Sequence, residues 1–158
     1  MTASMQDFEI KRADIADLNR IAPLVAAFHV EEGVGSDEAG RRESLARLLS
    51  EPQIGGIWIA ARGDADPVAY VALAFGFAIE FEGRDAFVDE VYVTPDSRGA
   101  GLGARLLKAA QEAAIGLGLK ALHLEVHQDN EKAARLYDRL GFARRPYRLM
   151  SMRLGENP

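Results

Sequence analysis

A glycine cluster that directly follows an arginine is the part of this sequence best suited to binding an anion. Residues 98–104 read Arg-Gly-Ala-Gly-Leu-Gly-Ala, and apolar residues at helical spacing follow Gly101. The first amide N–H groups of a helix have no partner within it and lie at the positive end of its dipole. Glycine also lets a ligand approach the backbone closely, because no Cβ intervenes. The cluster therefore predicts a site for a phosphate or pyrophosphate group.

Two adjacent acids, Asp89 and Glu90, stand in the β-branched segment that leads to this cluster. A carboxylate can take the proton from an ammonium group and so prepare an amine for attack. Neighbouring side chains of a strand point to opposite faces, so the alternation predicts that only one of the two acids serves a common cleft. On this pattern Asp89 shares a face with Val91 and Val93.

The elements that must position these residues follow from hydrophobic periodicity and turn signals. Asp14 is expected to cap a first helix, which Pro23 should kink or split. The connection 62–67 is rich in turn residues and predicts a hairpin. The full order expected is strand 8–11, helix 15–28, loop 32–39, a helix with Leu45, Leu48 and Leu49, strands 54–61, 68–77 and 86–93, helix 101–117, strand 121–126, helix 130–140 and a final pair of strands from Phe142 onward. The fold class is α/β of the α+β type, with a mixed, mostly antiparallel sheet flanked by helices and a parallel crossover over 86–126.

The composition is that of one ordinary globular domain. The chain has 158 residues, of which 48% are hydrophobic and 27% charged, and it contains no cysteine. A thiolate metal site and a thiol nucleophile are therefore excluded, and we expect no metal. A net charge of −5 argues against nucleic-acid binding. No apolar stretch is long enough for a bilayer and no secretory signal is visible, so a cytoplasmic protein without a membrane partner is expected.

Two families of nucleotide sites can be weighed against the glycine cluster. A P-loop needs Lys-Ser or Lys-Thr after its last glycine, which is absent here. Gly99, Gly101 and Ala104 satisfy the dinucleotide pattern G-x-G-x-x-G/A. Residues 95–98 nevertheless separate the strand from the first glycine, and an antiparallel hairpin before it does not suit a doubly wound sheet. A nicotinamide-dependent oxidoreductase is thus the weaker interpretation.

Two segments together resemble the GNAT superfamily of acyl-CoA-dependent N-acetyltransferases. In residues 91–103, Arg98, Gly101 and Gly103 match the family signature, and residues 130–142 resemble its later Asn…Ala…Tyr…Gly-Phe helix. The resemblance implies one domain over 1–158 (core about 7–154) that transfers an acetyl group from acetyl-CoA to a primary amine in a ternary complex. The alternative is an acyl-CoA-binding regulatory module without turnover.

The resemblance also implies the coenzyme contacts. The strand through Val93 should splay from strand 121–126, leaving a gap for the pantetheine arm. Main-chain groups would hold the pyrophosphate, with a charged contact from the Arg98 side chain. The coenzyme-binding residues expected are Val91, Tyr92, Val93, Arg98, Gly99, Ala100, Gly101, Leu102, Gly103, Ala104, Asn130 and Ala133, although Asn130 can equally cap a helix.

The catalytic and acceptor residues are expected from the same comparison. Tyr137 would protonate the departing thiolate of coenzyme A, or else pack on the apolar side of its helix. Asp89 is preferred to Glu90 as the base, directly or through a water. His29, Glu31 and Glu32 would border the acceptor pocket, and Glu80 and Glu82 its edge. The partner would be a small-molecule or peptide amine, and a homodimer is possible in such folds.

Overall fold

A computed structural model describes residues 7–155, which fall into two compact units that meet in sequence at Glu125 and Val126. Residues 1–6 and 156–158 of the expected domain lie outside the described residues. The first unit contains β1 (Glu9–Arg12), a 3₁₀ turn (Ile15–Asp17), α1 (Leu18–Glu32), α2 (Glu38–Ser50), β2 (Gly55–Ala61), β3 (Ala69–Ala78), β4 (Gly83–Val93), a 3₁₀ turn (Pro95–Ser97), α3 (Leu102–Gly116) and β5 (Ala121–His123).

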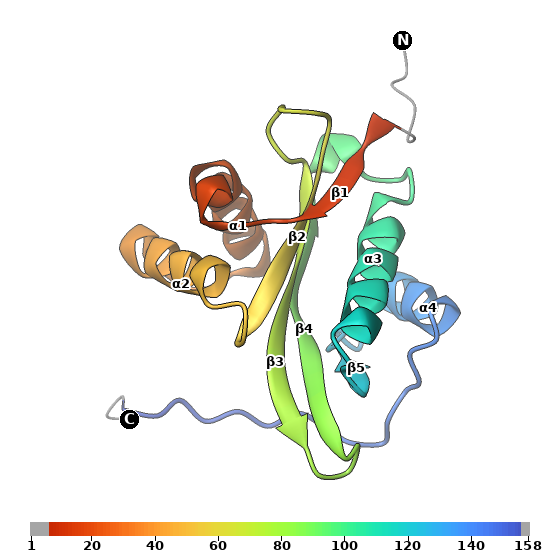
Figure 1. The fold of residues 1–158 in the computed structure, drawn as a ribbon. Helices are drawn as coiled ribbons and strands as arrows, with labels where there is room; N and C mark the ends of the chain where they lie inside the picture. Colours follow the sequence, from red (N-terminus) through yellow and green to blue (C-terminus); the bar gives the residue numbers. More distant parts are fainter. Residues whose placement is uncertain (1–6, 156–158) are drawn as a thin grey trace. The chain divides into compact units, whose positions relative to one another are not determined.

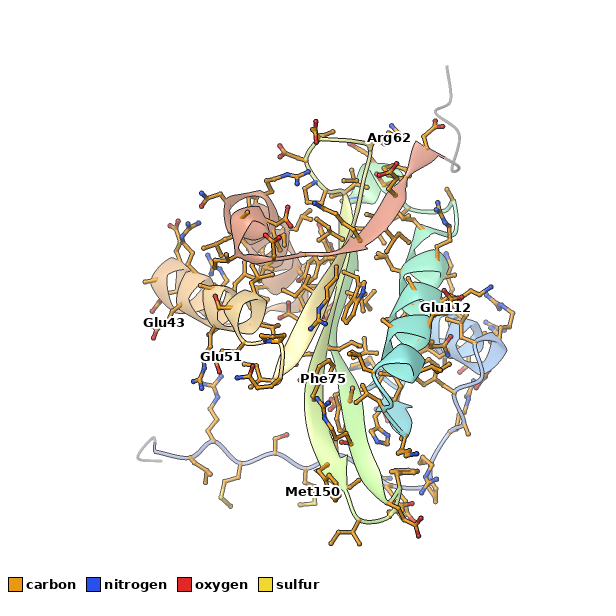
Figure 2. The ribbon with its side chains drawn as sticks, in the orientation of Figure 1. Glu43, Glu51, Arg62, Phe75, Glu112 and Met150 are labelled. Atoms are coloured by element: carbon orange, nitrogen blue, oxygen red, sulfur yellow. The ribbon has the colours of Figure 1, made fainter. Side chains whose placement is uncertain are left out.

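The five strands form one sheet in the order β1-β2-β3-β4-β5, with α1 and α2 on one face and α3 on the other (Figure 1). Only the β4–β5 pair is parallel, which confirms the expected mixed sheet and the crossover through α3. Strand β2 is buried along its whole length, with Ile57 and Ile59 packed in the α1–α2 core. In the connection after β2, the Arg62 guanidinium lies 4.1 Å from the ring centroid of Phe8, beside β1 (Figure 2).

Helix α1 begins and ends with clear local signals. The Asp14 carboxylate accepts the amide of Ala16 and opens the 3₁₀ turn that leads into the helix. Gly33 closes α1 in the left-handed region at φ 67°. Pro23 was expected to kink or split this segment; it lies inside α1, which is one continuous helix, so the second of these alternatives is wrong. The missing N–H of Pro23 forfeits one helical bond without ending the helix, because Ile21, Leu24 and Val25 are buried on the sheet side.

The second unit is built around α4 (Glu131–Arg139). The Asn130 side chain caps α4 by accepting the amide of Ala133 at 3.1 Å, and the rings of Tyr137 and Phe142 meet edge to face. The pair of strands expected from Phe142 onward is absent from the described residues up to 155. Apolar side chains of this segment, such as Met150 and Met152, are exposed. Strand propensity alone does not make a strand, because each needs a partner for its main-chain groups.

Candidate active site

A pocket of about 170 Å³ lies in the first unit where α1 and α2 cover β2, β3 and β4. Its polar lining comes from His29 of α1, Ser36 of the following loop, Arg41 and Ser44 of α2, and the two acids of β4. Its apolar lining is Val25, Leu45, Leu48, Ile57 and Ala72. The pocket therefore has charged groups set in an otherwise apolar wall, as small-molecule sites commonly do.

A β-bulge brings both acids into this pocket. Val88 of β4 is opposite Leu73 of β3 and Glu90 is opposite Ala72, so Asp89 is an extra residue without a partner. Asp89 and Glu90 both line the pocket. The expectation that only one of them could do so is wrong, because the bulge interrupts the alternation on which it rested. Beyond the bulge Val91 is opposite Val71 and no longer shares a face with Asp89.

Glu90 is held by two side chains, one on each carboxylate oxygen. The Tyr70 hydroxyl donates to Oε2 at 2.7 Å, and the His29 Nε2 lies 2.5 Å from Oε1. Burial, followed by the neighbouring Glu90 carboxylate, raises the pKa of the Tyr70 hydroxyl above its usual value. Tyr70 therefore remains a donor at any physiological pH, and the Glu90 carboxylate is fixed in place.

The network continues from His29 to α2. The His29 Nδ1 lies 2.8 Å from the Ser36 hydroxyl, and Arg41 Nη1 donates to the Ser36 carbonyl at 2.7 Å. The same nitrogen lies 3.4 Å from the Ser36 hydroxyl. Because a carboxylate can only accept, the His29 Nε2 donates to Glu90, and the Ser36 hydroxyl contacts the other ring nitrogen. The loop between α1 and α2 is thereby tied to the acids of β4.

Asp89 differs from Glu90 in having open oxygens. Its side chain makes no hydrogen bond or ion pair with any residue of the described chain, although it lines the pocket. Desolvation, and next the Glu90 carboxylate, raise the pKa of Asp89 above its usual value. A carboxylate with a raised pKa is a stronger base than an ordinary one.

The glycine cluster forms a sharp turn into α3. Gly99 and Gly101 have φ of 82° and 80°, in the left-handed region that favours glycine. Gly101 is the N-cap of α3 and no side chain caps this helix end. The amides of Leu102, Gly103 and Ala104 precede the first helical bond, which Arg105 makes to the Gly101 carbonyl. Such unfilled donors at a helix start fit the phosphate groups of a nucleotide-containing ligand.

The Arg98 side chain is already engaged at this turn. Its guanidinium donates to both carboxylate oxygens of Glu31, at 2.8 and 3.0 Å, and to the Val93 carbonyl at 2.8 Å. Glu31 therefore faces the glycine turn, and neither it nor Glu32 lines the pocket beside His29. Glu80 and Glu82 lie near the far end of the β3–β4 hairpin and are likewise outside its lining.

One edge of β4 beside the turn has main-chain groups without a partner strand. Thr94 donates its amide to Val68 on the β3 side, so alternation directs the main-chain groups of Val93 and Val91 to the opposite edge. Strand β5 pairs there only with Asp85, Ala86 and Phe87. Within the first unit, β4 from Val88 onward thus has no partner strand on that side, an arrangement open to an extended ligand.

The sequence did not single out Tyr70, Ser36 or Arg41. Tyr70 stands in an apolar run that is typical of a buried strand, and it is indeed fully buried. Its hydroxyl meets Glu90 only because β3 places Tyr70 beside β4. Arg41 belongs to an Arg-Arg pair that has no pattern of its own.

Comparisons with known proteins agree with this geometry. The sequence model of the Acetyltransferase (GNAT) family matches residues 22–142. A thialysine N-epsilon-acetyltransferase from Sus scrofa is 37% identical over 149 residues, covering 88% of this chain and 84% of the relative. The crystal structure of an integron cassette protein from the Cole Harbour Salt Marsh metagenome superposes with a TM-score of 0.81 at 30% identity, over 94% of this chain and 91% of that one. A predicted acetyltransferase from Clostridium acetobutylicum, solved with acetyl-CoA, shares the fold at 18% identity and a TM-score of 0.76, over 92% and 96% of the two chains.

The chain belongs to the GNAT family of acetyltransferases. It is an acetyl-CoA-dependent N-acetyltransferase, as the resemblance of its two motifs indicated. No helix within residues 7–155 is long and apolar enough to cross a membrane. The same residues contain no group of three or more His, Asp or Glu side chains that could hold a metal ion.

Proposed function

We propose that residues 7–154 act as one catalytic domain, in which the pocket beside β4 takes the amine and the start of α3 takes the coenzyme pyrophosphate. The β-bulge is the observation that carries this proposal, because it gives one pocket both a fixed carboxylate and an open one. The open amides of Leu102, Gly103 and Ala104 support the coenzyme half of the proposal. The main-chain groups of Val91 and the amide of Val93, on the edge of β4 without a partner strand, would hold the pantetheine arm between them.

The two acids have different tasks in this proposal. Asp89 accepts a proton from the ammonium group, since its oxygens are open and its pKa is raised. Glu90, held by Tyr70 and His29, adds negative charge that attracts the ammonium. His29 thus positions Glu90 rather than exchanging protons with the amine itself.

The remaining steps need a proton donor and no covalent intermediate on the protein. The neutral amine attacks the thioester directly, and the chain has no cysteine to accept the acetyl group. Tyr137 of α4 donates a proton to the thiolate that departs, for which a phenol is a suitable acid. Asn130 and Ala133 contribute coenzyme contacts at the start of the same helix.

A thiol-release assay tests the function. Purified protein is mixed with acetyl-CoA and a panel of amino acids, polyamines, aminoglycosides and peptides, and free coenzyme A is measured. We expect at least one amine to accelerate release well above background hydrolysis. Tight binding of acetyl-CoA with no accelerating amine would favour a regulatory module without turnover.

We also propose a cytoplasmic homodimer. Exposed apolar side chains of the second unit, such as Tyr147 and Met150, support self-association. Light scattering of the purified chain measures its mass in solution, and cell fractionation reports its location.

Substituting Gly103 separates coenzyme binding from folding. A Cβ at Gly103 would meet nothing closer than Val93 Cγ2 at 3.8 Å, and its backbone is not in the left-handed region. We therefore expect Gly103→Ala to keep or slightly raise the melting temperature, because alanine favours helix by about 1 kcal/mol. The same methyl group would stand where the phosphate approaches, so calorimetry should show coenzyme A affinity reduced about tenfold or more.

Gly116→Ala is the matched control at the other end of α3, where a Cβ also meets nothing within 4 Å. Gly116→Ala should likewise keep or slightly raise the melting temperature, and it should leave coenzyme A affinity unchanged. Equal affinities of the two variants would show that the α3 start does not hold the coenzyme.

A further inference from the structure

We infer that the acceptor carries a carboxylate as well as its amine, and that Arg41 of α2 binds that carboxylate. The inference rests on the function proposed above and names its substrate class, a small amino acid. It follows from how charge is distributed in the pocket: the two acids lie on β4 at one side, and Arg41 lies on α2 at the other.

Arg41 is a pocket arginine without a carboxylate partner. It forms no ion pair in the described part of the chain, and its hydrogen bonds all run from Nη1 to Ser36. Two other arginines of the same unit do have acidic partners: Arg98 pairs with Glu31 and Arg20 with Asp17. The Nη2 and Nε groups of Arg41 can therefore donate to a ligand as a planar fork, which matches the geometry of a carboxylate.

The position of this guanidinium is fixed relative to the acids. Ser36 contacts both Arg41 and His29, and His29 contacts Glu90. One hydroxyl and one imidazole ring thus span the distance from the cation to the carboxylate. A ligand with a positive group at one end and a negative group at the other can bridge the same distance, and both of its charges would be matched.

The size and the apolar walls of the pocket limit the part of the acceptor that lies between its two charged groups. Leu45, Leu48 and Ile57 provide an apolar wall that suits a short aliphatic chain. The volume of about 170 Å³ is below the roughly 300 Å³ at which pockets for drug-sized ligands begin. A small amino acid fits this space, whereas a large polycation would leave Arg41 facing a like charge.

The test compares each amino acid with its own carboxamide. The series runs from glycine to 6-aminohexanoate, and kcat and KM are measured for each acid and its amide with the full chain and acetyl-CoA. We expect the preferred acid to exceed its amide at least about tenfold in kcat/KM, since hydrogen bonds between charged groups are the strong ones. An amide that serves as well as its acid would overturn the inference without any variant being needed.

Variants of Arg41 then test whether this residue causes the preference for the acid over its amide. Arg41→Gln should raise KM for the acid about 10- to 100-fold with a far smaller effect on the amide, and Arg41→Lys should recover part of the loss. Arg42→Gln is the control, because Arg42 donates to Asn19 and lies outside this pocket, and it should change neither. Equal losses for acid and amide in Arg41→Gln would show that Arg41 only anchors the Ser36 loop.

Calorimetric binding of the acids, measured in the presence of coenzyme A, distinguishes the two proposals. Acids that bind through Arg41 without being acetylated would refute the transferase role of this pocket and leave the ligand class standing. Turnover of simple amines with no binding of any acid would refute the ligand class and leave the transferase role standing.

Discussion

Asp89→Asn is expected to lower kcat/KM for the amine about 100- to 10,000-fold and, at the same time, to raise the melting temperature near pH 8. Activity falls because the amide cannot take the ammonium proton. Stability rises because folding partly desolvates the Asp89 carboxylate, which remains partly exposed, and places it beside Glu90. Thiol release and thermal unfolding measure the two effects on the same samples.

The stability gained in Asp89→Asn should depend on pH in a defined direction. The pKa of Asp89 is raised in the folded state, first by desolvation and then by Glu90. The contribution of this group to stability is therefore complete below its unfolded pKa, about 3.9, and is lost as the pH rises through its folded pKa. The difference in melting temperature between variant and parent should accordingly shrink as the pH falls toward about 4.

Asp64→Asn serves as the control, because Asp64 is an exposed acid in the β2–β3 connection outside the pocket. It should leave both activity and melting temperature unchanged. Retained activity in Asp89→Asn would move the role of base to Glu90. A lowered melting temperature would instead mean that the Asp89 carboxylate holds the fold.

Tyr137→Phe is expected to lower kcat about 100-fold or more while the dissociation constant of coenzyme A changes less than about twofold. Phenylalanine keeps the ring that packs edge to face on Phe142 and removes the hydroxyl group. Stopped-flow turnover and calorimetric titration with coenzyme A separate the two quantities.

Tyr147→Phe removes a hydroxyl from an exposed tyrosine of the same unit and should have no effect on either quantity. If turnover of Tyr137→Phe equals that of the parent, another group protonates the thiolate. If coenzyme affinity falls as far as turnover does, Tyr137 is a binding residue.

Much of the fold could be predicted from local pattern. Alternation and turn residues placed β2, β3 and β4 within a few residues, and helical spacing placed α3 to within one residue at each end. These elements are specified by their own residues. The prediction of strands after Phe142 was wrong. A strand needs a partner strand, and the local sequence pattern does not show whether one is present.

The site was predictable where it is local and missed where it is not. The glycine turn is contiguous, so its residues identify it directly. Tyr70 and His29 both contact Glu90, from which they are 20 and 61 positions away in the sequence. No local pattern around Tyr70 or His29 predicts these contacts. The bulge could not be predicted from the sequence either, because it depends on the register between two strands.

That bulge also makes Asp89 an extra residue of β4 relative to β3. With Val88 opposite Leu73 and Glu90 opposite Ala72, the ladder on either side of Asp89 is already in phase. Deleting Asp89 would return the two strands to one-to-one pairing and leave Glu90 facing Tyr70 as before. The second acid of the pocket can thus be gained or lost by a single-codon insertion or deletion, with the first acid and the fold around it left in place.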